Sequence, residues 1–280
     1  MPLIQQIIIQ QTEQTEPLYQ AFHSLGYTTI RLHEALDFDF AGSLFVFQDT
    51  EVVPIRVDCL YLCVSKEDQE IILLEHGGDS DDSDDSESDS DSGDPLICFR
   101  SHYAYCALPD DIHRSIRKLD MSSCMPRPNS LVFHVGPFTK EWHDIKLCCE
   151  KKGVSLVHYS LASDIQGVPG GMSTLVYNSL FNVSFSENVE PIYEIIRCGR
   201  MPMTTHHAVF VLFGKKILYG KHAHEIVEKA MAFENRDDAY KRGKMKELLV
   251  YLRDNHTYLN RIQEWDRYIL ENTDFYLGVT

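Results

Sequence analysis

The chain has 280 residues, of which 44% are hydrophobic and 11% aromatic, and its formal net charge is −16. This length suits two domains of ordinary size, and the composition supplies enough apolar side chains for a core in each. No stretch approaches the roughly 18 uninterrupted apolar residues of a membrane span, and the first residues lack the pattern of a signal peptide. We therefore expect a globular cytoplasmic protein without a membrane anchor.

The cysteine pattern indicates a reducing compartment. None of the eight cysteines forms a CxxC pair, and the CxxxC pair, Cys59 and Cys63, lies in a strand-like run. Buried, reduced thiols are typical of such a pattern in the cytosol. The sequons at Asn182 and Asn255 need a secretory route to be used, so they carry little weight.

Much of the negative charge lies in one run. The segment from Gly77 to Asp94 holds nine acidic residues and no basic one, which leaves 33 acidic and 26 basic residues, a net charge of −7, elsewhere. A segment so polar and self-repelling is predicted to be a disordered loop. A solvated insertion is favoured over a cation sponge, a polyanion mimic or a kinase target. Since there is no basic stripe to release counterions, nucleic acid is not an expected partner.

The first half of the chain alternates between strands and helices. Strands are predicted over 3–9, 27–32, 43–47, 56–65, 70–75 and 96–100, and helices over 15–26 and 110–118. Such alternation predicts a mainly parallel sheet. The two prolines of "MPRPNS" (125–130) then interrupt the pattern and predict an interdomain linker. The first domain is therefore expected to span 1–125, with the acidic loop at 77–94.

The alternation restarts after the linker, in a second domain expected to span 126–280. Strands are predicted over 131–135 and 154–160, and helices over 139–153, 172–180, 222–233, 236–256 and 258–273. Between them a strand from Phe181 leads into a helix that ends at Gly199, followed by a strand at "MPMTT". The whole pattern predicts an α/β protein with two facing Rossmann-like domains and C-terminal helices. In such sheets ligands bind at the carboxyl ends of strands.

The segment from Phe181 to His207 carries the candidate ligand site. Ser186 follows the strand, Asn188 is a good N-cap, and the free backbone N–H groups of the helix start suit a phosphate. Glu194, one turn into the helix, could hold a ribose by its hydroxyls. Three glutamates share one face of this segment: Glu187, Glu190 and Glu194. A solvated acidic surface explains them without a ligand, and the pattern alone favours that interpretation.

The sequence "PIYEIIRCGRMPMT" resembles the donor-binding half of exostosin-like glycosyltransferases, with Glu194, Gly199 and Pro202 at corresponding places. The likeness extends over roughly 130–270 through "SLVFHVG", "EWHDI" and "GVSLVHYS". It implies a glycosyltransferase of the GT-B type, similar to small soluble xylosyltransferases of large algal viruses, which would act in the host-cell cytoplasm. The implied reaction moves a sugar, xylose from UDP-xylose foremost, to a hydroxyl of a glycan or glycoprotein. The "CGRMP" step departs from the "GCIPV" spacing more usual in that family.

Glycosyl transfer needs a general base, stabilisation of the leaving diphosphate and a cleft that excludes water. The candidates for the base follow strands of the first domain: Asp49, Glu51 and His102. The candidates for the donor site lie in the second domain: Lys140, His158, Tyr159, Ser160, Ser186, Glu187, Asn188, Glu194, His206 and His207. For the base candidates an ordinary loop carboxylate or a capping histidine is the favoured interpretation, and Asp49 ranks first among them because it directly ends an apolar strand. Each donor-site candidate could equally be an ordinary loop residue.

We expect inversion at the anomeric carbon and neither a metal nor a cofactor beyond the nucleotide-sugar substrate. The "DFD" at 37–39 lacks the strand-end context of a metal motif and is interpreted as a surface turn. The competing hypothesis is a catalytically inactive nucleotide-binding module whose acidic loop recruits a basic partner.

Overall fold

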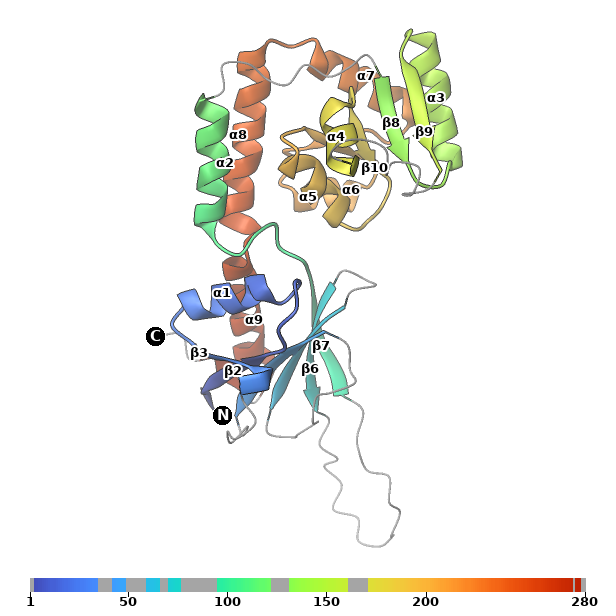
Figure 1. Ribbon diagram of the computed structural model, residues 1–280. Helices are drawn as coiled ribbons and strands as arrows, with labels where there is room; N and C mark the ends of the chain where they lie inside the picture. Colours follow the sequence, from blue (N-terminus) through green and yellow to red (C-terminus); the bar gives the residue numbers. More distant parts are fainter. Residues whose placement is uncertain are drawn as a thin grey trace, which may run out of the picture. The chain divides into compact units, whose positions relative to one another are not determined.

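The protein is a mixed α/β structure (Figure 1). The computed structural model describes residues 3–34, 42–48, 59–65, 70–76, 95–121, 131–160, 171–273 and 275–277. The acidic run at 77–94, the "DFD" at 37–39 and the expected linker at 125–130 lie outside these residues. The chain divides into two compact units: unit 1 comprises Met1–Asp111 and Asp254–Thr280, and unit 2 comprises Ile112–Arg253.

Unit 1 is built on a six-stranded sheet with the order β3-β2-β4-β5-β6-β7. A short pair of β1 and β13 lies beside it in the same unit, in parallel register. The strands are β1 (Leu3–Ile4), β2 (Gln6–Ile9), β3 (Thr28–Arg31), β4 (Ser43–Phe47), β5 (Leu60–Val64), β6 (Glu70–His76), β7 (Pro95–His102) and β13 (Tyr276–Leu277).

The expectation of a mainly parallel sheet is correct for β2 to β5 and wrong for β6 and β7. The pairs β2–β3, β2–β4 and β4–β5 are parallel, whereas β5–β6 and β6–β7 are antiparallel. For the β5–β6 pair the reason lies in the length of the connection. The segment between Val64 and Glu70 is too short for the crossover of a dozen or more residues that a parallel pair needs, so the chain forms a hairpin there.

The strands of unit 1 are apolar on both faces. Ile7, Ile9, Leu44 and Val46 belong to the same core as Trp265, whereas Ile8, Phe45, Phe47 and Tyr61 form a second cluster on the opposite face. This division follows from the two-residue period of a strand. The first core is covered by α1 (Glu16–Ser24) and α9 (Tyr258–Asn272), which pack against each other. The single turn η1 (Leu32–Glu34) follows β3.

The described part of unit 2 contains two parallel ladders, β8–β9 and β10–β11–β12. Its strands are β8 (Leu131–Val135), β9 (Ser155–Tyr159), β10 (Asn182–Ser184), β11 (Pro202–Thr204) and β12 (Leu218–Tyr219). Its helices are α2 (Pro109–Met121), α3 (Lys140–Lys151), α4 (Gly171–Asn178), α5 (Glu190–Arg197), α6 (His207–Leu212), α7 (Ala223–Glu234) and α8 (Asp238–Asn255).

The two ladders of unit 2 meet between β8 and the start of β10. The N–H of Leu180 donates to the carbonyl of Leu131 at 2.8 Å, and the N–H of Phe133 donates to the buried hydroxyl of Ser179 at 3.2 Å. The strand β9 therefore lies along one edge of β8, and the start of β10, which comes later in the chain, lies along the other edge. A parallel sheet in which the connections reverse direction in this way has a topological switch point.

The helix α5 begins and ends where its sequence predicts, within one residue. Its N-cap is Val189 and not Asn188, but the Asn188 side-chain oxygen accepts the N–H of Glu190 at 3.0 Å and so satisfies the first turn. Gly199, with φ of 71°, closes the helix in a Schellman motif, because its own N–H reaches Ile196 O and the next N–H reaches Ile195 O. The apolar side chains of α5 and its N-cap are buried: Val189, Ile192, Tyr193, Ile195 and Ile196.

The division into units differs from the expected boundary at residue 125. The helix α9 contributes Ile262, Trp265 and Ile269 to the unit 1 core, so residues 254–280 belong with the first part of the chain. The boundary therefore falls within α2 and again within α8. Among the described residues, no helix combines the length and the hydropathy needed to cross a bilayer.

Candidate functional site

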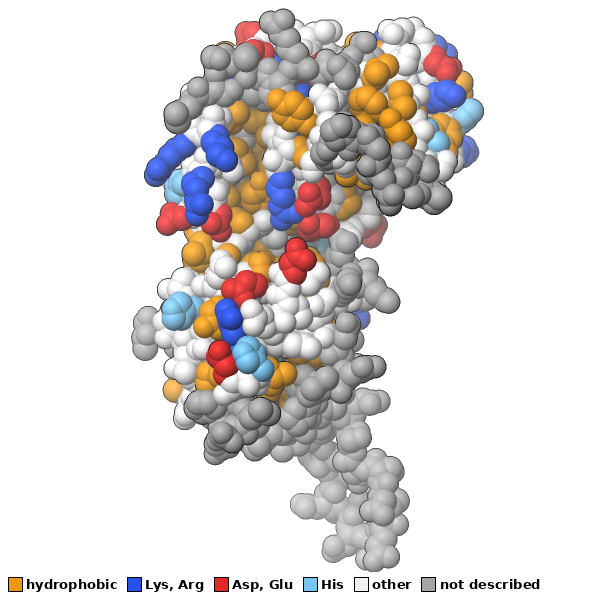
Figure 2. Space-filling model, in the orientation of Figure 1, with side chains coloured by type: hydrophobic (Ala, Val, Ile, Leu, Met, Phe, Trp, Pro, Cys, Tyr) orange, Lys and Arg blue, Asp and Glu red, His pale blue; other side chains and the backbone are white. Residues whose placement is uncertain are grey.

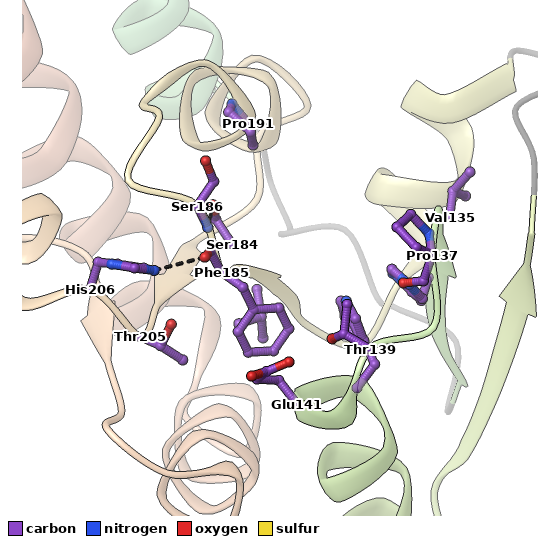
Figure 3. Close-up of a pocket in the computed structure, with 13 residues that line it drawn as sticks. Val135, Pro137, Thr139, Glu141, Ser184, Phe185, Ser186, Pro191, Thr205 and His206 are labelled. Carbon is purple, nitrogen blue, oxygen red and sulfur yellow. Dashed lines mark hydrogen bonds between the residues drawn. The ribbon is translucent and has the colours of Figure 1, made fainter. Parts of the chain in front are cut away.

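A cavity of about 640 Å³ opens in unit 2 at the carboxyl ends of β8, β10 and β11 (Figure 3). Three short segments line it, each of which joins the end of a strand to the start of a helix: the β8–α3, β10–α5 and β11–α6 connections. The lining residues are His134, Val135, Pro137, Thr139, Glu141, Trp142, Val183, Ser184, Phe185, Ser186, Pro191, Thr205 and His206. The cavity thus lies at the switch point, where open α/β sheets bind their ligands.

The β8–α3 connection provides an aromatic wall and a carboxylate. The ring of Trp142 is stacked on that of His134, with centroids 4.0 Å apart, and meets the edge of Phe185 at 5.2 Å. His134 Nε2 lies 3.0 Å from the carbonyl of Pro137, which holds the ring in place. Burial lowers the pKa of His134, and neighbouring His158 adds to this effect, although the contact with Pro137 opposes it. His134 is therefore neutral at neutral pH.

Glu141 brings negative charge into the same cavity. Hydrogen bonds from its own backbone N–H and from the Thr139 hydroxyl hold the pKa of this carboxyl below its usual range, and Lys140 adds to the effect. In Figure 3 the Glu141 carboxylate lies beside the ring of Phe185, and Ser186 and Pro191 lie on the other side of that ring. The cavity is therefore apolar along one wall and polar at both ends.

The β10–α5 and β11–α6 connections provide hydroxyl groups and a histidine. Ser186 Oγ accepts the N–H of Asn188 at 3.0 Å, which fixes the turn that leads into α5. The backbone N–H of His206 donates to Thr204 Oγ1 at 3.1 Å, and its ring Nε2 lies 2.7 Å from the carbonyl of Phe185. These bonds tie the two connections together and keep the His206 ring in the lining (Figure 3).

The structure brings some of the predicted donor-site residues together. Ser186 and His206 line the cavity, and Glu187 lies at its rim, with its carboxylate 3.5 Å from His206 Nδ1. Asn188 supports the turn between them through its bond to Glu190. A concavity therefore lies at this strand-to-helix connection, and the donor-binding role of these residues stays a prediction.

Other predicted residues lie outside the lining. Glu194 is half-exposed, and its carboxylate accepts a hydrogen bond from Arg197 on the same helix. Lys140 and His207 are exposed first residues of α3 and α6. The end of β9 is also outside: His158 stacks on His134 at 5.1 Å, Ser160 Oγ lies 3.4 Å from His158 Nε2, and the carbonyl of Tyr159 accepts the N–H of Gly136.

The candidates for the catalytic base belong to unit 1. Asp49 and Glu51 lie outside the described residues. His102 is the last residue of β7, where its carbonyl accepts a hydrogen bond from Arg261 Nε at 3.2 Å. Since β7 runs parallel to β5, two strands away, this position is at the carboxyl edge of the unit 1 sheet, as predicted.

Sequence reasoning missed several lining residues, chiefly His134, Thr139, Glu141 and Trp142. The sequence does carry a signal for them, because the β8–α3 connection follows a predicted strand and contains Lys140. Successive helical residues point about 100° apart. The residue after Lys140 therefore turns toward the cavity when Lys140 itself turns toward solvent, and the sequence alone does not tell which of the two faces inward.

The lining can bind a ligand that has both an apolar ring and polar groups. Hydroxyl groups and two imidazoles are available, but none of the described lining residues is a lysine or an arginine. On the face shown in Figure 2, the described Lys and Arg side chains lie in separate groups with Asp and Glu side chains among them. Comparisons of the chain with protein-family models, with curated proteins and with solved structures find no match.

Proposed function

We propose that unit 2 binds a nucleotide sugar in the cavity at its switch point, and that the protein is a glycosyltransferase. The observation that carries this proposal is the cavity itself, which gathers the carboxyl ends of three parallel strands around one hollow. Its volume of about 640 Å³ lies within the range of roughly 300–1,000 Å³ that is typical of small-molecule sites.

The chemistry of the lining supports a ligand of this class. The aromatic wall formed by Trp142 and Phe185 suits the flat face of a base or the apolar face of a sugar. Carboxylate and hydroxyl oxygens, from Glu141 and Thr139, suit the hydroxyls of a ribose or a sugar ring. Ser186 and His206 lie toward the start of α5, where the Ser186 hydroxyl can donate a hydrogen bond to a diphosphate oxygen.

The proposed reaction is a single displacement. The acceptor oxygen forms a bond to the anomeric carbon while the bond from that carbon to the diphosphate oxygen breaks. The acceptor proton passes to a general base, and the nucleoside diphosphate leaves with the electron pair. The configuration at the anomeric carbon is thereby inverted. The proposed reaction requires no divalent ion, and its favoured donor is UDP-xylose. A GT-B arrangement, with unit 1 as the acceptor half, is part of the same proposal.

A binding assay followed by a turnover assay tests the proposal. Trp142 lies in the lining, so a bound ligand should change its fluorescence, and a Trp265→Phe background removes the signal from unit 1. UDP-xylose, UDP-glucose, UDP-galactose and GDP-mannose form the panel. Slow release of the free nucleoside diphosphate is the expected sign of turnover. NMR of the anomeric linkage, with and without a chelator, then tests inversion and metal independence.

A second candidate is an inactive module that binds a nucleotide without turnover. It is favoured by the lack of a lysine or arginine among the described lining residues, because a leaving diphosphate needs compensating charge. Binding without any release of nucleoside diphosphate would select this candidate. If no member of the panel binds, both candidates fail.

A further inference from the structure

Glu141 is the acidic residue among the described residues that line the cavity, and neither a lysine nor an arginine of that lining balances it. Hydrogen bonds from its own backbone N–H and from the Thr139 hydroxyl hold the pKa of this carboxyl below its usual range, so the side chain is ionised at neutral pH. Lys140 adds to this lowering, but its side chain is exposed and lies outside the lining. A ligand in the cavity therefore meets a negative charge with two oxygen acceptors.

The carboxylate gives the cavity a direction. It lies beside the ring of Phe185, whereas Ser186 and Pro191 lie on the other side of that ring (Figure 3). Because like charges repel, a diphosphate is disfavoured next to Glu141 and is better placed toward Ser186. The uncharged part of a nucleotide sugar, which carries the hydroxyls, is then the part that reaches Glu141.

The surroundings of the carboxylate suit a pyranose ring. The rings of Trp142 and Phe185 meet edge to face at 5.2 Å and form the apolar wall next to it. A pyranose has a face of C–H groups and a rim of hydroxyls, so the face can pack on an aromatic ring while the hydroxyls donate to a carboxylate. A sugar with a carboxylate of its own brings a second negative charge to the same place.

We propose that Glu141 selects the donor sugar, because it accepts hydrogen bonds from the hydroxyls of the transferred sugar and repels sugars that carry a carboxylate. The inference rests on the proposed function and narrows its donors to nucleotide sugars with an uncharged sugar. Since Glu141 is exposed in an open cavity, solvent screens its charge. The selection is therefore expected to be about three- to tenfold.

The experiment compares two donors of similar size, UDP-glucose and UDP-glucuronic acid, which carry a hydroxymethyl group and a carboxylate at the same carbon. Calorimetric titration at pH 7 measures their dissociation constants and that of UDP. The proteins are wild type, Glu141→Gln and, as a control, Glu150→Gln. Glu150 is an exposed residue of the same helix, α3, and lies outside the lining. If neither UDP-sugar binds, GDP-mannose, GDP-mannuronic acid and GDP take their places.

Wild type should bind UDP-glucose about fourfold more tightly than UDP-glucuronic acid, which is the repulsion of two charges about 5 Å apart in water. More salt should reduce this ratio. Glu141→Gln should bind both donors equally, and UDP-glucose about fivefold more weakly than wild type does, because an amide oxygen is the weaker acceptor. The affinity for UDP should not change, since UDP lacks the transferred sugar. Glu150→Gln should follow wild type.

Equal or tighter binding of the acidic donor by wild type overturns the inference alone, and so does a ratio that persists in Glu141→Gln. An equal loss of affinity for UDP also overturns it, because that loss places the carboxylate at the ribose. If Glu141→Gln does not fold, a wild-type ratio that is independent of salt has the same meaning. If wild type binds no member of either set, the proposed function fails as well.

Discussion

Replacing the buried Arg200 by methionine should destabilise unit 2 by about 3 kcal/mol. Its side chain is 5% exposed, and its guanidinium donates to the carbonyls of Ser179 and Leu180 at 2.8 and 3.0 Å and to Glu234 Oε1 at 3.2 Å. These bonds hold the segment that leads into β10, and so the strand that lines the cavity.

The magnitude follows from what methionine removes and what it spares. All three acceptors are contacted by Nη2, which has two hydrogens, so methionine removes about two hydrogen bonds in full. Hydrogen bonds to charged groups contribute about 1.5–3 kcal/mol each. Part of this loss is offset because a buried guanidinium carries a desolvation cost that methionine lacks. Glu234 also keeps an ion pair with Lys241 at 3.4 Å, so the change does not leave its carboxylate unpaired. The expected loss therefore lies near the cost of one to two charged hydrogen bonds.

Arg197 provides the matched control, three positions earlier in the sequence. Its side chain is 39% exposed and pairs with Glu190 and Glu194. Exposed pairs contribute about 1 kcal/mol or less, so Arg197→Met should change stability little. Urea unfolding is followed by Trp142 fluorescence in a Trp265→Phe background, which reports on unit 2. Equal losses in the two variants, or a loss below about 1 kcal/mol for Arg200→Met, would refute the reasoning.

Three further changes test other parts of the structure. Burial lowers the pKa of His134, so the unfolded chain binds more protons than the folded one. The contribution of His134 to the free energy of unfolding is fully present above pH 6.5 and declines below it. The urea midpoint of unit 2 should therefore fall from pH 7 to pH 5.5, and it should fall less in His134→Gln. Because Glu194 pairs with Arg197 outside the lining, Glu194→Gln should leave the calorimetric affinity for UDP-xylose within about twofold, and a tenfold loss would restore its role as a donor ligand. Deleting Asp79 to Asp91 should leave the melting temperature and any turnover close to wild type, since loop closure depends weakly on length; a large loss would implicate the segment in function.

The local structure was predictable where the pattern of apolar residues is strong. The strands at 43–47 and 131–135 have the predicted bounds, and α5 (Glu190–Arg197) is closed by Gly199 as expected. These features depend on periodicity and on residues with special backbone geometry, and both are visible in a sequence. The hairpin of β5 and β6 could also have been inferred, because the length of the connection between them excludes a parallel pair.

A cavity lies where the sequence placed the donor site, but only some of the predicted residues line it. Ser186 and His206 line the cavity, whereas Glu194 pairs with Arg197 and Lys140 points to solvent. The direction of a side chain in the first turn of a helix depends on how that helix packs, and a single sequence does not contain this information. The sequence does not predict the return of α9 to unit 1 for a similar reason, because the apolar face of a helix does not specify which core it packs against.

The discontinuity of unit 1 has a consequence for how the protein is made. Residues 112–253, which form unit 2, leave the ribosome as one uninterrupted block. Unit 1 must wait for α9, since Trp265 and Ile262 complete the core that Ile7 and Leu44 begin. Until then this apolar face of the first sheet is covered in part by α1 and lacks the side chains of α9. During synthesis unit 2 can therefore reach its native state before unit 1. The part of unit 1 that is made first has the greatest need of protection by chaperones.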